Sequence, residues 1–142
     1  MGSSERALFR YGPAGKHLTT KEAKKVLAAL FDECNRQYFD GGLRRPRFSL
    51  YKSDNQYGRY TCHRVKSGIE GHIWISYSHD WDHNLLKTLM IHEMIHHRVK
   101  TVEHRNGGLF GHNWRFRREC RRLRREFGLV IPIHFKRIPV NF

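Results

Sequence analysis

The residues of this sequence best suited to chemistry are His92, Glu93 and His96, which match the pattern His-Glu-x-x-His. On a helix, the four-residue spacing places the two imidazoles about 40° apart on one face, where both can reach the same ion. Neutral imidazole is a preferred ligand of Zn²⁺. Glu93 is rotated by one residue, so it can reach a water molecule at the metal and act as general base. The pattern predicts one zinc ion and the hydrolytic chemistry typical of metallopeptidases.

The surroundings of the pattern carry more weight than the pattern itself. The chain contains 11 His, and chance alone gives about 0.05 matches in such a sequence. Around the motif, however, apolar residues point in nearly every direction of a helical wheel, which is typical of a helix buried on all sides. Polar residues in such a helix each cost several kcal/mol unless they have partners. A metal or a dense hydrogen-bond network must therefore meet them.

A catalytic zinc ion normally takes three protein ligands, so a third must come from elsewhere in the chain. His112 follows the chain reversal expected at 106–108, and an antiparallel helix pair would return it to the first two ligands. Glu119, on the buried side of the following helix, is the alternative and would complete a site of two histidines and a glutamate. His112 is the expected third ligand, with Glu119 as the second choice.

Other residues near the motif are less suited to bind the metal. His104 lies eight residues after His96, about 12 Å further along a continuous helix, too far for the same ion. His97 points about 100° away from His96 and is expected to pack beside the site. The candidates for stabilising the developing oxyanion are Tyr57, Tyr60 and Arg115.

The rest of the sequence predicts an α+β domain that holds the motif on a buried central helix. Helical spacing of apolar residues and capping signals predict three helices, over about 20–38, from 82 or 84 to beyond 99, and over about 113–127. Short β-favouring runs at 48–51, 57–62 and 69–77 predict a three-stranded antiparallel meander. Residues 1–18 are expected to form a flexible arm, and the stretch after Gly128 an extended tail or edge strand.

The composition is strongly basic and points to polyanionic partners. Lys and Arg number 27 against 13 Asp and Glu, a formal net charge of +14, and such a field attracts nucleic acid. Much of this charge lies on the third predicted helix, where an arginine face opposes an apolar stripe. The predicted contacts with phosphate are Arg117, Arg118, Arg121, Arg122, Arg124 and Arg125. The alternative is a cationic face that only meets solvent.

Cysteine usage and the N-terminus suggest where the protein acts. The three cysteines are scattered and form no CxxC pair, which favours reduced thiols in an intracellular protein. The sequence begins with no apolar run of signal-peptide length. We expect a monomer without membrane contact, in the cytoplasm with the nucleoid, or in the nucleus of a eukaryote.

The sequence resembles the SprT-like (Spartan-type) zinc metallopeptidase family. The resemblance rests on HEMIHH at 92–97 and on Gly111-His112 followed by Phe116, and it extends over about residues 25–130. It implies a zincin-like domain over 19–142, zinc held by His92, His96 and His112, and Glu93 as the catalytic residue. It further implies substrates that are proteins bound or crosslinked to DNA. Asn113 departs from the glycine that often follows the third histidine in the family.

Three hypotheses for function follow from the sequence. The first is a DNA-associated zinc endopeptidase in which the substrate peptide adds as a strand beside residues 69–77. The second is a nucleic-acid-binding protein without peptidase activity, whose zinc is structural and has Glu119 or His97 as fourth ligand. The third is a peptidase without a nucleic-acid role, whose charge attracts acidic protein substrates.

Overall fold

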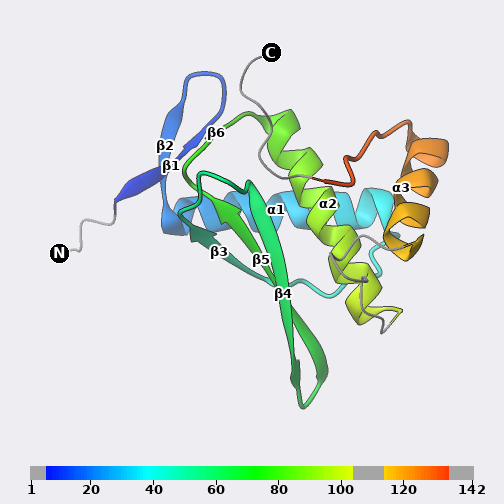
Figure 1. Cartoon of the computed structure of the whole chain (residues 1–142). Helices are drawn as coiled ribbons and strands as arrows, with labels where there is room; N and C mark the ends of the chain where they lie inside the picture. Colours follow the sequence, from blue (N-terminus) through cyan, green and yellow to red (C-terminus); the bar gives the residue numbers. More distant parts are fainter. Residues whose placement is uncertain (1–5, 104–113, 135–142) are drawn as a thin grey trace.

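The protein has an α+β fold built from three helices and two small sheets (Figure 1). The computed structural model describes residues 6–103 and 114–134. The helices are α1 (Thr20–Tyr38), α2 (His83–Thr101) and α3 (Trp114–Phe127). The strands are β1 (Ala7–Tyr11), β2 (Lys16–Thr19), β3 (Arg47–Tyr51), β4 (Gly58–Val65), β5 (Gly68–Ser76) and β6 (Asp80–Trp81). The predicted fold class is confirmed at this level, and the three predicted helices are confirmed with nearly the predicted bounds.

The sheet beside α2 is mixed, so the predicted antiparallel meander is wrong. Its strand order is β3-β5-β4, with β4 antiparallel and β3 parallel to the central strand β5. Burial explains the order: β5 buries Ile73, Ile75 and Ser76, whereas the residues of β4 are exposed or only half-buried. The strand that is covered best takes the centre. The edge strand next to α2 is therefore β4.

Residues 7–19 form a hairpin instead of the flexible arm predicted for 1–18. Strand β1 pairs with β2 in antiparallel orientation, and β6 adds to β1 in parallel orientation. Phe9 is fully buried in this sheet and stacks on Trp81, with ring centroids 6.3 Å apart. The indole Nε1–H of Trp81 donates a hydrogen bond to the carbonyl of Ser76 at 2.8 Å. These contacts tie the hairpin to the end of β5.

The helix ends follow local signals in the sequence. Thr19 and Glu22 form a reciprocal capping box at the start of α1. The Asp82 side chain caps α2 by accepting a hydrogen bond from the backbone N–H of Leu85 at 2.8 Å. Helix α3 ends at Phe127, and the next residue, Gly128, has a φ of 70°, a conformation that favours glycine. These caps fix the bounds of the elements that carry the candidate site.

Helix α2 lies at the centre of the molecule, between the sheet, α1 and α3 (Figure 1). Ten of its residues are buried, and they lie on every side of the helix. This confirms the predicted helix that is covered all round. After α3, residues 129–134 run back toward α2 without forming a strand, and Ile131 is buried there. Among the described helices, none is long and apolar enough to cross a membrane.

Candidate metal centre

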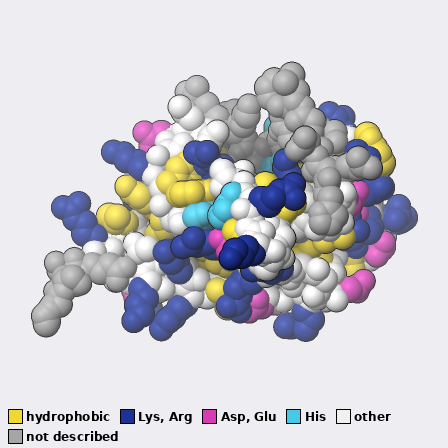
Figure 2. All heavy atoms as spheres, turned by 90° about the horizontal axis from the view of Figure 1, so that it is seen from below, with side chains coloured by type: hydrophobic (Ala, Val, Ile, Leu, Met, Phe, Trp, Pro, Cys, Tyr) yellow, Lys and Arg dark blue, Asp and Glu magenta, His cyan; other side chains and the backbone are white. Residues whose placement is uncertain are grey.

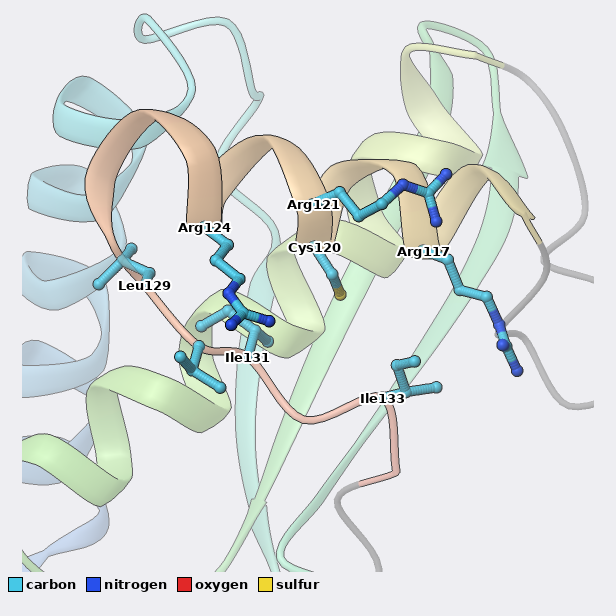
Figure 3. Close-up of a pocket in the computed structure, with 8 residues that line it drawn as sticks. Arg117, Cys120, Arg121, Arg124, Leu129, Ile131 and Ile133 are labelled. Carbon is cyan, nitrogen blue, oxygen red and sulfur yellow. The ribbon is translucent and has the colours of Figure 1, made fainter.

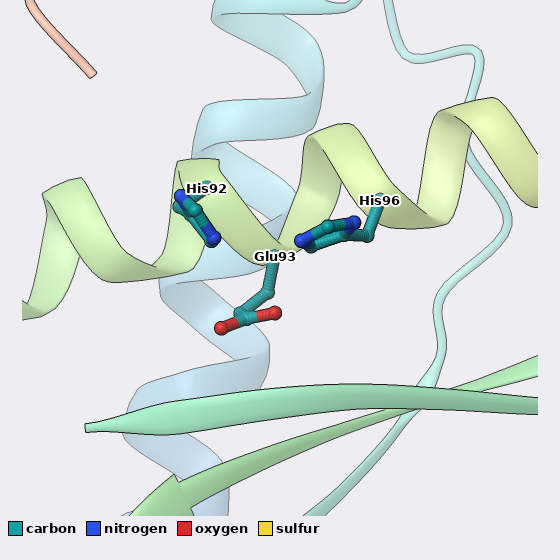
Figure 4. Close-up of side chains that lie close together, drawn as sticks. All are labelled: His92, Glu93 and His96. Atoms are coloured by element: carbon teal, nitrogen blue, oxygen red, sulfur yellow. The ribbon is translucent and has the colours of Figure 1, made fainter. Parts of the chain in front are cut away.

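His92, Glu93 and His96 converge at the middle of α2 (Figure 4). One ligand atom from each lies within 4.8 Å of the others. His92 and Glu93 are buried, each with 3% of its surface exposed, and His96 is half-buried. The Glu93 carboxylate extends toward the strands of the sheet, and both imidazoles lie beside it (Figure 4). The structure thus brings together the three residues that the sequence predicted.

The imidazole of His92 is oriented by the segment that follows α3. Its Nδ1 lies 2.8 Å from the carbonyl oxygen of Pro132. A carbonyl oxygen can only accept, so Nδ1 carries the proton and donates this hydrogen bond. The other ring nitrogen, Nε2, then carries the lone pair that a metal ligand requires. The backbone at Pro132 therefore selects the tautomer of His92 that can bind a metal through Nε2.

Burial gives the Glu93 carboxyl an unusually high pKa for a glutamate side chain. Removal from water disfavours the charged form and raises the pKa of Glu93 to about 8. The strand opposite comes very close: a Cβ atom at Gly58 would lie 3.3 Å from Glu93 Oε2 and 2.8 Å from the Trp74 carbonyl oxygen. The lack of a side chain at Gly58 therefore lets the start of strand β4 approach the carboxylate.

The donor set fits a divalent cation bound through nitrogen. Two imidazoles and a buried carboxyl meet in one place, and no described basic side chain forms an ion pair with Glu93. A cation at this point would stabilise the ionised form of Glu93 and so offset the cost of its burial. Two histidines and a glutamate suit zinc, and the same donors accept other transition metals.

His97 packs beside the site and is not a ligand, which agrees with the prediction. Its Nε2 lies 2.6 Å from the Arg44 carbonyl oxygen and its Nδ1 lies 2.8 Å from the Tyr60 hydroxyl. Because the carbonyl accepts, Nε2 carries the proton and Nδ1 accepts from Tyr60. The Tyr60 ring in turn stacks on His96, with 6.3 Å between ring centroids. His97 thus holds Tyr60 against a candidate ligand.

A missing side chain at Gly71 makes room for this contact. A Cβ atom at Gly71 would lie 2.4 Å from both His97 Nδ1 and the Tyr60 hydroxyl oxygen. We expect Gly71→Ala to break the Tyr60–His97 hydrogen bond and to lower the free energy of unfolding by about 1–3 kcal/mol. Urea denaturation measures the change. Lys66→Ala, in the exposed turn of the same hairpin, is the control, and equal stability of the two variants would contradict this account of Gly71.

Glu119, the second choice for the third metal ligand, does not belong to the cluster of His92, Glu93 and His96. It is buried, but its carboxylate pairs with Arg122 at 3.1 Å and with Arg98 at 3.6 Å. Within 6–103 and 114–134, the group that could hold a metal comprises His92, Glu93 and His96. Glu119 forms ion pairs because basic residues of α2 and α3 surround it. The preferred third ligand, His112, lies outside the described residues and stays a prediction.

These contacts also bear on the hypothesis of a structural zinc with four ligands. The two fourth ligands considered were Glu119 and His97. Glu119 is engaged by two arginines, and both ring nitrogens of His97 have hydrogen-bond partners. Neither side chain is available to close the coordination sphere. The structure therefore gives this hypothesis no support from either residue.

The candidate oxyanion stabilisers differ in their surroundings. Tyr60 uses its hydroxyl to hold His97. Tyr57 packs against Trp81, with 5.6 Å between ring centroids. The Arg115 guanidinium lies over the Trp114 ring, at 4.3 Å from its centroid. The interaction of these groups with a substrate stays a prediction.

The arginines of α3 divide into two flanks. Arg118 and Arg122 are half-buried and form ion pairs with Glu103 and Glu119 respectively, at 2.6 Å and 3.1 Å. The remaining members of the predicted set are exposed: Arg117, Arg121, Arg124 and Arg125. Figure 2 shows that Lys and Arg side chains are spread over the described part of one face of the molecule. Nucleic-acid binding by the six arginines stays a prediction.

Several residues that shape the site could not be predicted from the motif. Pro132 acts through its backbone carbonyl, which gives no signal in the residue type. Gly58 and Gly71 act through the side chain they lack, and both lie inside the runs 57–62 and 69–77 that the sequence predicts as strands. An isolated glycine inside a strand is a recognised sign of close backbone or side-chain approach. That signal could have identified Gly71.

Comparison of the chain with models of protein families, with curated proteins and with solved structures finds no match.

Proposed function

We propose that the protein is a zinc-dependent endopeptidase of the SprT-like, zincin-like type. The observation that carries the proposal is the convergence of His92, Glu93 and His96 on a helix that is otherwise buried and apolar. Within residues 6–103 and 114–134, the buried Glu93 carboxyl forms no ion pair with a basic side chain, so its burial is costly, and a bound metal would offset that cost. His112 is the proposed third zinc ligand, as the resemblance implies.

The residues of α2 account for the proton transfers of peptide hydrolysis. A zinc ion held by His92 and His96 would supply Lewis acidity, polarising the scissile carbonyl and making water more acidic. Glu93 takes a proton from the attacking water as that oxygen bonds to the carbonyl carbon. It then gives the proton to the nitrogen of the leaving amine as the C–N bond breaks. The Pro132 carbonyl keeps His92 in the tautomer that this site needs.

The substrate strand is proposed to lie along β4, not along 69–77 as the sequence suggested. Residues 68–76 form the central strand β5, whose two edges are already paired with β3 and β4. The free edge of the sheet on the side of α2 belongs to β4, which starts beside Glu93 at Gly58. An extended peptide that pairs with this edge would pass the carboxylate.

Hydrogen exchange tests this placement of the substrate. We expect a bound peptide substrate to slow amide exchange in Gly58–Val65, because an added strand protects the N–H groups of the edge it pairs with. The Glu93→Gln protein allows the measurement without cleavage. Exchange in Arg47–Tyr51, on the opposite edge, is the internal control. Protection confined to that opposite edge would contradict docking at β4.

Metal analysis tests the zinc site itself. We expect the protein to hold one zinc ion per chain after dialysis, and His92→Ala and His96→Ala each to remove it, because a ligand lost from a three-ligand site is not replaced. His63→Ala removes an exposed histidine that lies outside the cluster, and should leave the zinc content unchanged. Full zinc content in both ligand variants would place the metal elsewhere.

Association with DNA is proposed as part of the function. It is supported by the net charge of +14, whose field draws the protein toward a polyanion. The resemblance then implies that the substrates are proteins bound or crosslinked to DNA. Cleavage of a basic protein should be faster when that protein is bound to DNA, and the advantage should disappear at high salt. An equal rate with and without DNA would favour a peptidase without a nucleic-acid role.

A further inference from the structure

We propose that the groove between α3 and residues 129–133 binds an acidic, aliphatic peptide segment of a partner protein. The groove has a volume of about 240 Å³ and lies between α3 and the chain segment that follows it (Figure 3). Its lining is Arg117, Cys120, Arg121 and Arg124 from α3, with Leu129, Val130, Ile131 and Ile133 from the segment that follows. This site goes beyond the proposed peptidase activity and does not depend on it.

The walls of the groove offer an aliphatic surface. Val130 has 73% of its surface exposed, the largest exposure among the large hydrophobic residues that are described as exposed. Leu129 and Ile133 are half-buried beside it, and Cys120 faces the groove from α3 (Figure 3). Neighbouring apolar side chains at the surface mark sites that bind a partner. A ligand for this groove must therefore present apolar groups.

The rim of the groove is cationic. Arg117, Arg121 and Arg124 follow one another at helical spacing, so they line the same flank of α3 (Figure 3). Among the ion pairs of the described residues, Arg121 and Arg124 take no part, whereas the other flank of the helix is neutralised by glutamates. A guanidinium matches a carboxylate with two parallel hydrogen bonds. The ligand should therefore carry carboxylates next to its apolar groups.

The groove is preformed, because its second wall is anchored at both ends. At the helix end, the N–H groups of Gly128 and Leu129 donate to the carbonyls of Arg124 and Leu123, at 3.0 Å and 3.3 Å. Further along, the Pro132 carbonyl accepts the hydrogen bond from His92. A wall held in this way loses little conformational freedom when a ligand binds, and this increases the affinity that the contacts can give.

The chemistry of the lining favours a peptide over nucleic acid. Proteins that hold single strands stack bases on aromatic rings, and the groove is lined by aliphatic side chains, a cysteine and arginines. Leucine or isoleucine side chains of a peptide match such a floor, and neighbouring aspartate or glutamate side chains match the rim. Of the six arginines predicted to contact phosphate, three line this groove and are proposed to bind carboxylates of a peptide instead: Arg117, Arg121 and Arg124.

Fluorescence anisotropy with labelled peptides tests the site without zinc or cleavage, so its outcome is independent of the peptidase proposal. The probe is a peptide of repeated Asp-Leu-Ser-Glu-Ile units, and the comparison peptide has Ser in place of Leu and Ile. We expect the double variant Arg121→Gln, Arg124→Gln to bind the probe about tenfold more weakly or worse, because it loses two charge-assisted contacts with the carboxylates of the peptide. Val130→Ser should weaken binding of the probe peptide but not binding of the comparison peptide, which lacks Leu and Ile.

The control is Arg125→Gln, which removes an exposed arginine of α3 that does not line the groove. It should change the affinity less than about twofold. All substituted residues are exposed, so we expect each variant to fold, and thermal unfolding measures whether it does. The proposal is overturned if the serine peptide binds as tightly as the probe, or if Arg125→Gln weakens binding as much as the double variant. It is also overturned if oligothymidylate binds in place of the probe and is lost in the same double variant.

Discussion

We expect Glu93→Gln to lower the rate of peptide cleavage by about 10²–10⁴-fold and to leave the zinc content unchanged. Glutamine has almost the same shape as glutamate but cannot take a proton from water at neutral pH. The two imidazoles that would hold the metal remain in place, since His92 is fixed by Pro132 and His96 packs against Tyr60. The loss should therefore fall on catalysis and not on metal binding.

The measurement combines metal analysis with cleavage of a protein substrate under single-turnover conditions. Glu33→Gln makes the same chemical change at an exposed position of α1 and should retain full activity. If Glu93→Gln retains both its zinc and full cleavage, Glu93 is not the general base. If the variant loses its zinc, Glu93 is a metal ligand, and its carboxylate belongs to the coordination sphere.

Helical elements and the motif could be predicted because their signals are local. Apolar residues at helical spacing and capping residues such as Thr19 and Asp82 determine where α1 and α2 begin. The His-Glu-x-x-His spacing likewise refers to a single helix. Once residues 92–96 are predicted to be helical, helix geometry alone brings His92, Glu93 and His96 together.

Pairing of strands and support of the site depend on residues far apart in the chain. The sequence identified the runs that became β3, β4 and β5, but consecutive strands were assumed to pair, and β3 instead pairs with β5. The hairpin of β1 and β2 is not predicted from the sequence, because its strands are short and each buries a single residue, Phe9 in one and Leu18 in the other. Contacts such as His92 with Pro132 come from tertiary structure alone.

Metal-free Glu93→Gln protein is expected to be more stable than the metal-free wild type above pH 8. In the unfolded chain the Glu93 carboxyl has its ordinary pKa of 4.5, and in the folded protein burial raises it to about 8. Between these values the folded protein holds a proton that the unfolded chain has released, so the stability of the wild type falls as pH rises. The fall ends above the folded pKa and amounts to several kcal/mol, at most about 5 kcal/mol.

Glutamine at position 93 cannot ionise, so the variant should lack this part of the pH dependence. Urea denaturation in the presence of EDTA at pH 5, 7 and 9 measures the difference. The gap between variant and wild type should be small at pH 5 and should widen through pH 7 to pH 9. A gap that does not change with pH would mean that Glu93 is ionised in the folded protein and has a cationic partner there.

With zinc bound, the stability of the wild type at high pH should rise relative to that of Glu93→Gln. A cation beside Glu93 favours the carboxylate over the carboxylic acid, so metal binding offsets the cost that burial imposes at high pH. A side chain that destabilises the empty site and is stabilised by the metal is typical of a residue kept for function, because stability alone would favour glutamine or an apolar residue at this position. The pH dependence of folding thus tests, without any substrate, whether α2 is organised around a metal.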